Sequence, residues 1–402
     1  MPIKKKELKD LSLERLRDMQ KEFKDVHLLL IDEKSMVGMY TLYMIDKRLR
    51  EIKPENATKP FGGVSVILMG DFAQLAPVKD QPLYSKSNKI TQCQMTGRLL
   101  FKKFRKTMIF DQQMRQIGED QKQYNKLLDR VANAETTLDD WYLLKTRELT
   151  GDGIIPPDQQ EEIWKNGRKI CALNANMVEY NKQRIRALDA PIAKIKSENK
   201  PTTVEQFSLK ASQAQNLPPI VWLAKGSKVR LTMNIFKKAG LTNGAVGTVV
   251  GIIYEENCKP QDLPSMIIVH FPDYIGKMSY KGMDGCWPIV PVARDWYDPI
   301  RRKRRWRRML PVMESYASTI HTCQGQSISG PVIIDLQAPK EFADGLIFTS
   351  LSRIKKFSQL SFTKVPDFTW FKNMKKRQSI RDRLAHEKKE REEDANFDAN
   401  SD

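Results

Sequence analysis

The order of hydrophobic and polar positions predicts alternating helices and strands in the N-terminal part of the chain. Residues 11–24 and 35–52 carry apolar side chains at helical spacing. Residues 26–31 and 64–69 are short, continuously apolar runs, which are typical of strands buried on both faces. Strand, helix and strand in this order predict a βαβ unit of a parallel sheet. Because parallel strands end at one edge, the acidic residues after both strands should lie where α/β folds bind ligands.

The rest of the chain predicts a second α/β region that is interrupted by a small β module. Residues 221–292 change to short strands with turns, and Asn243-Gly244 within them is a strong hairpin signal. The flanking segments are a helical stretch at 98–150, a strand at 169–173, a helix at 174–188, a polar connection at 191–220 and a buried strand at 331–336.

Composition narrows the class of protein. Lys and Arg number 68 against 49 Asp and Glu, and the resulting charge of +19 favours a polyanionic partner such as nucleic acid or a membrane surface. The 40% hydrophobic share supports a packed core and excludes wholesale disorder. The apolar runs are too short to span a bilayer, and the charged N-terminus shows no secretory signal. An odd number of scattered cysteines indicates reduced thiols, and no His or Cys spacing suits a catalytic zinc.

The ends of the first two strands carry candidate chemistry. Residues 28–33, Leu-Leu-Leu-Ile-Asp-Glu, have the form of a Walker B strand, in which Asp32 would hold Mg²⁺ and Glu33 would activate water. An apolar strand that merely ends in Asp-Glu is the structural alternative. After the second strand, the amide of Gln74 can hydrogen-bond a γ-phosphate or its attacking water. The alternative for this loop is an ordinary turn in which Asp71 caps a helix.

Two later blocks complete a recognisable pattern. Residues 311–327 contain Ala-Ser-Thr-Ile-His-Thr-Cys-Gln-Gly-Gln-Ser, and residues 348–354 read Phe-Thr-Ser-Leu-Ser-Arg-Ile. With the two strand ends, in this order and spacing, they resemble motifs II, III, V and VI of superfamily 1 helicases. The PIF (petite-integration-frequency) DNA helicases are the family that the chain resembles, with RecD-like helicases next. Residues 112–116 resemble motif IV, and the resemblance runs from about residue 11 to 356.

The resemblance implies a role for each matching residue. Asp32 and Glu33 take the magnesium and base roles, and Gln74 takes that of the γ-phosphate sensor. Arg115 and Arg353 would stabilise the charge of the transferred phosphate, since a guanidinium fork matches phosphate oxygens. Taken singly, either arginine could instead form a surface salt bridge. The remaining implied residues are Gly325 at the nucleotide, and Thr319, His321 and Gln324 between the DNA strand and the nucleotide cleft.

The sequence departs from the family pattern in two places. Thr322-Cys323 stands where the family usually has Lys-Ser, so one cationic contact is absent. No Gly-x-x-x-x-Gly-Lys-Ser/Thr loop, the Walker A phosphate cradle, is found: Gly276-Lys277 is followed by Met278, and Phe271 stands where the first glycine belongs. In the family this loop precedes motif II by far more residues. We therefore expect a helicase that lacks its N-terminal Walker A portion.

The densest positive charge lies at residues 301–308, Arg-Arg-Lys-Arg-Arg-Trp-Arg-Arg. One interpretation is nucleic-acid contact through Arg304, Arg305 and Trp306, in which stacking on a base contributes about 1–3 kcal/mol. A nuclear-import signal and a solvated turn are the alternatives.

We predict an α/β fold of two RecA-like motor domains of the P-loop NTPase type, with a β-barrel-like insertion in the second. The expected parts are an incomplete first motor domain at 1–105, a second motor domain at 106–221 and 311–366, an insertion at 222–310 and a charged, partly disordered tail at 367–402.

The resemblance implies an ATP-dependent 5′→3′ DNA helicase that uses ATP and Mg²⁺ to translocate on single-stranded DNA and to unwind duplexes in repair, recombination and telomere maintenance. It implies single-stranded DNA and duplex junctions as partners, no membrane, action as a monomer on DNA, and a nuclear location, with mitochondrial or cytoplasmic locations as alternatives. The missing Walker A loop motivates two other hypotheses: a non-catalytic nucleic-acid-binding remnant of such a helicase, or an incomplete gene model.

Overall fold

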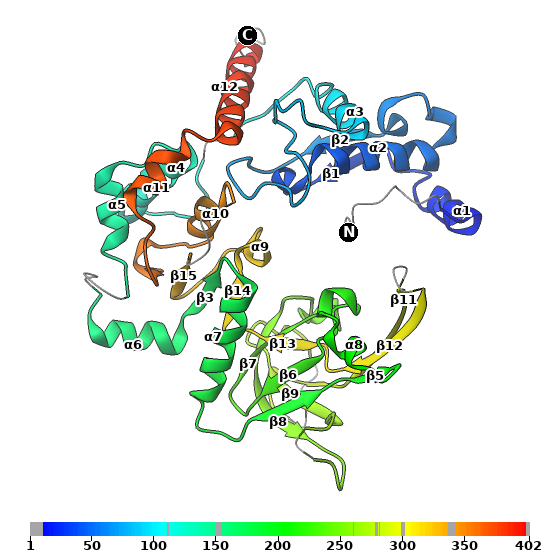
Figure 1. The fold of residues 1–402 in the computed structure, drawn as a ribbon, viewed down its shortest axis with the longest axis vertical. Helices are drawn as coiled ribbons and strands as arrows, with labels where there is room; N and C mark the ends of the chain where they lie inside the picture. The colour runs from blue at the N-terminus through cyan, green and yellow to red at the C-terminus, as the bar shows by residue number, and fades with distance from the viewer. Residues whose placement is uncertain are drawn as a thin grey trace. The chain divides into compact units, whose positions relative to one another are not determined.

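The chain folds into two units, which we describe separately. A computed structural model describes residues 11–110, 112–149, 155–259, 261–277, 280, 282–298, 302–336 and 343–398. Unit 1 consists of Met1–Lys165 and Ile320–Asp402, and unit 2 of Asn166–Thr319 (Figure 1). Residues of the predicted second motor domain are found in both units. In the part of the chain that the structure describes, no helix is both long and apolar enough to cross a membrane.

Unit 1 begins with the predicted βαβ unit. Strands β1 (Leu28–Ile31) and β2 (Ser65–Leu68) pair in parallel, and helix α2 (Met39–Ile52) connects them. One face of this pair packs on a core that includes Leu42 and Leu49 of α2. On the opposite face, Leu28, Leu30 and Ile67 are about half exposed, at 49%, 54% and 47%. The strands are therefore buried on one face only among the described residues, where the sequence pattern predicted burial on both.

The remaining elements of unit 1 are mostly helices. The predicted helical stretch at 98–150 holds the end of α3, then α4 and α5, and no α-helix lies between Lys102 and Gly118 in the described residues. Strands β15 and β16 form a parallel pair. The bounds are α1 (Leu13–Glu22), α3 (Gln92–Phe101), α4 (Lys122–Ala132), α5 (Leu138–Lys145), α6 (Pro157–Asn166), α9 (Ile320–Cys323), β15 (Val332–Asp335), α10 (Leu346–Ser352), β16 (Leu360–Phe362), α11 (Phe368–Met374) and α12 (Gln378–Asp398).

Unit 2 contains the predicted strand and helix pair and a group of antiparallel sheets. Strand β3 (Arg168–Cys171) precedes α7 (Asn174–Arg186) and pairs in parallel with β14 (Ala317–Thr319). The larger sheet has the order β10-β9-β8-β7-β13, and its residues share one hydrophobic core with those of the β4-β6 pair. The bounds are β4 (Ala193–Lys196), β5 (Glu198–Lys200), α8 (Val204–Ser208), β6 (Ile220–Leu223), β7 (Lys228–Leu231), β8 (Val246–Ile253), β9 (Met266–His270), β10 (Cys286–Ile289), β11 (Val292–Asp298), β12 (Lys303–Met309) and β13 (Val312–Glu314).

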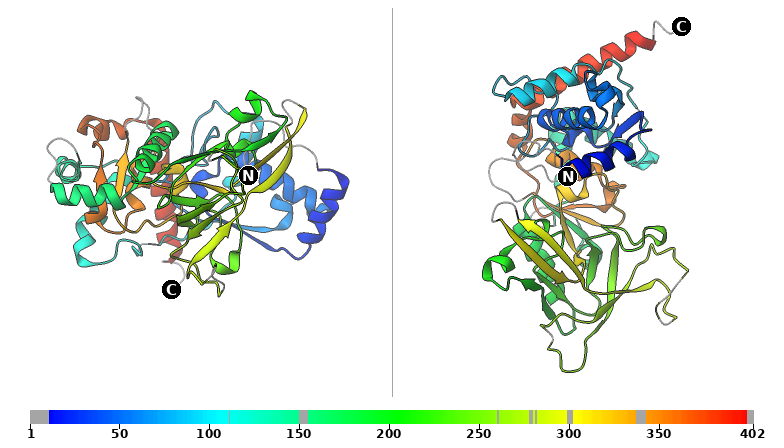
Figure 2. Two further views of the ribbon diagram at one scale, coloured as in Figure 1. Left: turned by 90° about the horizontal axis from the view of Figure 1, so that it is seen from below. Right: turned by 90° about the vertical axis from the view of Figure 1, so that its right-hand side faces the viewer.

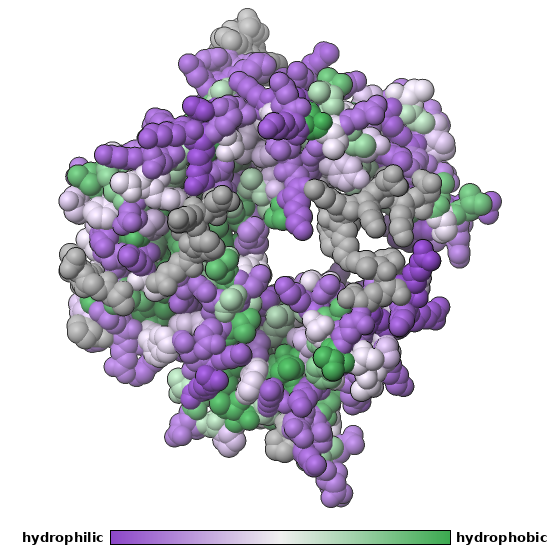
Figure 3. All heavy atoms as spheres, viewed as in Figure 1, coloured by the Kyte–Doolittle hydropathy of each residue, from purple (hydrophilic) through white to green (hydrophobic). Residues whose placement is uncertain are grey.

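Two parts of unit 2 differ from the expected pattern. The stretch at 191–220, expected to be a polar connection, contains β4, β5 and α8, and β5 joins β12 in a sheet with the order β11-β12-β5 (Figure 2). The turn at Asn243-Gly244 does not form a two-residue hairpin, because β7 and β8 are joined by a longer loop that the Phe236–Leu241 bridge closes. Hydrophilic residues predominate on the face of the molecule seen in Figure 3.

Candidate active site

Two loops of unit 1 meet at the edge where β1 and β2 end. The Lys34 N–H donates to the carbonyl oxygen of Met69 at 2.7 Å, which ties the loop after β1 to the loop after β2. Gly70 permits this approach because its φ is +126° and an added Cβ would lie 2.8 Å from the backbone nitrogen of Lys34. The carboxylates of Asp32, Glu33 and Asp71 therefore belong to two adjoining loops.

Glu33 contacts a segment that lies almost three hundred positions later in the chain. The side-chain amide of Gln324 donates to Glu33 Oε2 at 2.9 Å and to Ser35 Oγ at 3.0 Å. The next residue, Gly325, has φ of +76°, and an added Cβ would lie 3.2 Å from Glu33 Oε1. Glu33 itself takes the left-handed conformation, with φ of 57°. The structure thus brings together three residues that the sequence assigned to one cleft.

The two predicted arginines share Ser352, the last residue of α10, as a hydrogen-bond partner. Arg115 donates to Ser327 Oγ and to the carbonyl oxygen of Ser352, both at 2.8 Å. Arg353 is 2% exposed and donates to Ser352 Oγ at 3.0 Å. Both guanidinium groups therefore converge on Ser352.

Burial and the neighbouring carboxylates act on the pKa values of these arginines in opposite directions. The pKa of Arg353 is lowered to about 10: burial and the positive charge of Arg115 lower it, and the carboxylates of Glu33 and Asp71 partly offset them. Burial also lowers the pKa of Arg115, which Glu33 raises. Both remain cations near neutral pH. Arg353 Nε has no hydrogen-bond partner among the described residues, and neither has the buried Gln324 Oε1. Such open, buried polar atoms beside two carboxylates suit a ligand with phosphate oxygens and bound water.

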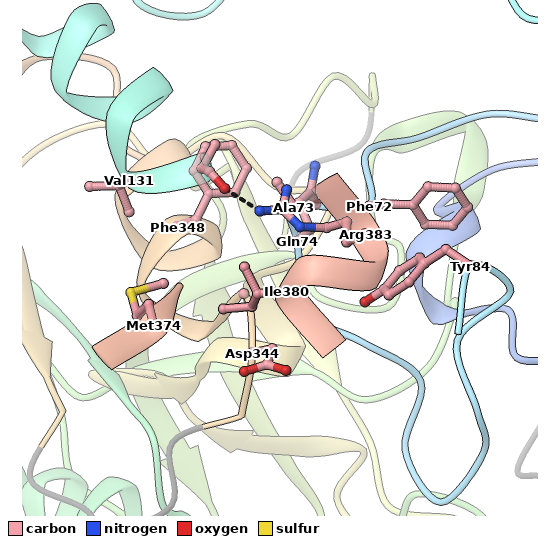
Figure 4. A pocket seen from close by; sticks show the side chains of 12 residues that line it. Phe72, Ala73, Gln74, Tyr84, Val131, Asp344, Phe348, Met374, Ile380 and Arg383 are labelled. Atoms are coloured by element: carbon pink, nitrogen blue, oxygen red, sulfur yellow. Dashed lines mark hydrogen bonds between the residues drawn. The ribbon is translucent and has the colours of Figure 1, made fainter. Parts of the chain in front are cut away.

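Gln74 has neighbours of its own in unit 1. It lines a small pocket with Phe348 and Arg383 (Figure 4), and its buried Oε1 has no partner among the described residues. The next backbone N–H, that of Leu75, donates to Thr349 Oγ1 at 3.0 Å, which ties this loop to α10. No hydrogen bond between described residues joins Gln74 to Glu33 or to either arginine.

The predicted DNA-coupling residues of the 311–327 block fall on both sides of the unit boundary. Thr319 ends β14 in unit 2, opposite Cys171 of β3. His321 lies in α9 of unit 1 with an exposed side chain. Gln324 contacts the carboxylate site of unit 1 through its hydrogen bond to Glu33.

The basic run forms strand β12, whose side chains alternate between two faces; Arg301 lies outside the described residues. Arg305 is 2% exposed and its guanidinium binds Asp298, Gln206 and Glu205. Arg305 is therefore a buried structural residue in this fold, which differs from the expected nucleic-acid contact. The reason is the two-residue period of a strand, which turns alternate cations inward.

The outward face of β12 keeps the other predicted contacts. Arg304 is exposed, and Trp306 is half-buried with the ammonium group of Lys200 above its ring, 5.3 Å from the centroid. The sequence reasoning missed Arg307, which is fully buried and donates four hydrogen bonds, and it missed Ser327 and Ser352. Nothing in the local pattern distinguishes these three residues, since tertiary contacts alone define them.

Comparison with known proteins identifies what the chain is similar to. A family model described as PIF1-like helicase matches residues 1–139. The human ATP-dependent DNA helicase PIF1 is 25% identical over 342 residues, which cover 83% of this chain and 45% of that protein. ATP-dependent DNA helicase PIF7 of Trypanosoma brucei brucei is 25% identical over 367 residues, which cover 83% of this chain and 35% of that protein. The chain thus spans about half the length, or less, of these relatives.

Solved structures show the same fold. The Pif1 helicase of Candida albicans aligns with a TM-score of 0.66 at 19% identity, covering 88% of this chain and 75% of that one. Bacteroides Pif1 bound to single-stranded DNA aligns with a TM-score of 0.56 at 18% identity, covering 94% and 80%. These likenesses confirm the predicted α/β fold with two RecA-like domains. The barrel form of the insertion stays a prediction.

Proposed function

We propose that this chain is a PIF1-like helicase, as its similarity to that family suggests, and that it couples ATP hydrolysis to 5′→3′ translocation on single-stranded DNA and to duplex unwinding. One observation carries the proposal: Glu33 and Gln324 are in direct contact, and Arg115 and Arg353 lie close enough to Glu33 for its charge to shift both of their pKa values. These residues come from four separate segments. A fold that gathers a half-buried carboxylate and two cations in this way suits phosphoryl transfer to water.

Each residue has a defined task in this reaction. Glu33 accepts the proton of the attacking water, and the two arginines stabilise the charge that develops on the phosphate oxygens. Asp32 is exposed, and its Oδ1 accepts the Glu33 N–H at 2.7 Å. Its carboxylate therefore fits Mg²⁺, which prefers oxygen ligands and supplies charge neutralisation when it is bound with ATP. Gln74, in the loop after β2, takes the role of the γ-phosphate sensor.

The nucleic-acid partner is proposed to be single-stranded DNA and duplex junctions. The exposed Arg304 and the aromatic ring of Trp306 offer a cation and a stacking surface on one face of β12. The Bacteroides structures with bound single-stranded DNA, and with ADP-AlF3 and single-stranded DNA, support the same choice of ligands. We further propose a role in repair, recombination and telomere maintenance, a nuclear location, and action as a monomer on DNA.

An ATPase and unwinding assay tests the proposal. We expect the chain to hydrolyse ATP faster when single-stranded DNA is added, and to unwind a fork that has a 5′ tail. Glu33→Gln should lower hydrolysis by at least about 10²-fold, because general-base catalysis contributes about 10²–10⁴-fold, while DNA binding persists. The matched control is Glu55→Gln, a carboxamide change at an exposed carboxylate of unit 1.

Two outcomes would contradict the proposal in different ways. Hydrolysis at the unchanged rate in Glu33→Gln removes Glu33 from the base role. DNA binding without any hydrolysis in the parent chain supports the remnant hypothesis instead, and a chain extended at its N-terminus by a phosphate-binding loop then shows whether activity returns.

A further inference from the structure

Helix α12 packs on unit 1 along one face, although its sequence reads as a charged tail. The side chains on that face recur every three or four residues, and Ile380, Asp382 and Arg383 are 3%, 4% and 6% exposed. Asp382 Oδ2 accepts the backbone N–H of Lys86 at 2.8 Å. Further along, Thr107 Oγ1 donates to Glu390 at 3.2 Å. The helix is therefore attached to the first part of unit 1 at two separate points.

The same face supports the loop that carries Gln74. The His386 ring lies 5.6 Å from the ring of Phe72 and 5.4 Å from that of Phe101. Phe72 is two residues before Gln74, and Gln74 lines one small pocket together with Ile380 (Figure 4). The position of the Gln74 loop thus depends on side chains of α12.

The residue before α12 and the first turn of α12 also hold the start of α10. Arg377 donates to Asp344 Oδ1 at 2.8 Å, and the hydroxyl of Ser379 binds the other oxygen of the same carboxylate. Asp344 directly precedes Gly345, the N-cap of α10, and α10 ends at the residue before Arg353. Arg383 adds a hydrogen bond to the carbonyl oxygen of Ala132, at the end of α4. One helix therefore touches the Gln74 loop and the base of the helix that leads to Arg353.

We propose that α12 is a positioning clamp, by which we mean that its buried face (residues 379–390) sets the places of Gln74 and Arg353 together. The expected effect on catalysis rests on the proposed ATPase function. The contacts that α12 makes do not depend on that function. Neither Asp382 nor His386 touches the Glu33 site, so both act through the loop and helix that they hold. Loosening the clamp should displace two groups of the reaction at once and leave Glu33 in place.

Two variants and a matched control test the clamp in the full chain. Asp382→Ala removes the acceptor of the Lys86 N–H, and His386→Ala removes the ring between Phe72 and Phe101. Lys388→Ala is the control on the opposite face of the same helix, where Lys388 is 79% exposed in its side chain and pairs with Glu392 at 3.9 Å. We expect kcat for ATP to fall on the order of tenfold in both variants, since a 1 Å misplacement can cost about 10²-fold. KM for ATP should change less than twofold, and Lys388→Ala should match the parent.

Hydrogen exchange provides a readout that does not depend on activity. Both variants should lose amide protection at residues 72–76 and at 345–352, while residues 39–52 of α2 keep theirs. Loss confined to α12, or no loss, overturns the clamp. If the parent chain hydrolyses no ATP, the proposed function fails, and the exchange pattern still decides whether α12 positions these two segments. If Asp382→Ala does not fold, His386→Ala and the milder His386→Leu carry the same test.

Discussion

At the scale of single residues, the contact of Gln324 with Glu33 is the most informative feature of the site. The amide N–H that binds Glu33 Oε2 occupies a carboxylate lone pair that a general base needs for water. Under the proposed function, Gln324 belongs to the segment that couples the DNA strand to the nucleotide cleft, and this hydrogen bond would then connect that segment to the base. We therefore interpret the observed contact as a resting arrangement in which Gln324 restrains Glu33.

This interpretation predicts the behaviour of Gln324→Ala. Without the amide, Glu33 is free to accept a proton in the absence of DNA. DNA-independent hydrolysis should therefore rise by about 10- to 100-fold, because a hydrogen bond to a charged group contributes about 1.5–3 kcal/mol and each 1.36 kcal/mol is about tenfold in rate. The stimulation by single-stranded DNA should shrink in proportion. A coupled ATPase assay with and without oligonucleotide measures both rates, and Gln326→Ala, two positions away, is the control. A fall in the DNA-independent rate would show that Gln324 supports Glu33 and does not restrain it.

The residue scale also shows how far the sequence could predict the site. Glu33, Arg115 and Arg353 could be predicted as candidates because their motifs are local strings of side chains. Ser327 and Ser352, which hold the arginines, were not found because serine has no distinguishing pattern and its role arises only from the tertiary fold. Gln74 was found by motif as well, and its place beside α12 depends on contacts over three hundred positions apart.

At the scale of elements, strand and helix periodicity was sufficient where burial is apolar. The βαβ unit, β3 with α7, and β15 all follow from apolar runs. Periodicity was insufficient for residues 191–220, because this segment is held by buried polar groups. Arg307 donates to the carbonyl oxygens of Gln206, Leu209 and Leu217 from a strand about one hundred positions away. A segment whose carbonyl groups are held by a buried cation does not need a periodic hydrophobic pattern, so its structure cannot be predicted from that pattern.

Alternation along β12 predicts unequal effects of two neighbouring arginine substitutions. Arg307→Ala removes the guanidinium donor from Asn199 Oδ1 and from the carbonyl oxygens of Leu209 and Leu217, so the free energy of unfolding should fall by about 3 kcal/mol. Arg308→Ala removes an exposed pair with Glu198 at 3.4 Å and should cost about 0–1 kcal/mol. Urea unfolding of both variants, followed by circular dichroism, measures the difference. Equal losses would mean that the inward and outward faces of β12 are not distinct.

At the scale of the whole molecule, each unit has its own hydrophobic core and its own candidate ligand. The Glu33 site and both arginines lie in unit 1, whereas Arg304 and Trp306 lie in unit 2. The net charge of +19 therefore says less about ligand binding than the positions of the individual cations do. Part of the basic run is turned inward, and the cations that remain outside are the ones available to DNA phosphates.

This division predicts two separable patterns of ligand protection. A ligand that binds the native state stabilises it by about 2.7 kcal/mol at a hundredfold excess over Kd, so amides near the ligand should exchange more slowly. ATPγS with Mg²⁺ should protect residues 28–36 and 320–327, and single-stranded oligothymidine should protect residues 198–208 and 303–309. Raising the salt concentration should abolish the second effect first, because phosphate contacts release counterions. Hydrogen exchange with mass spectrometry resolves all four segments in one experiment. If DNA does not protect residues 303–309, or if that protection survives high salt, β12 does not bind nucleic acid through phosphate contacts. Protection of residues 28–36 by ATPγS would still support the nucleotide site in either case.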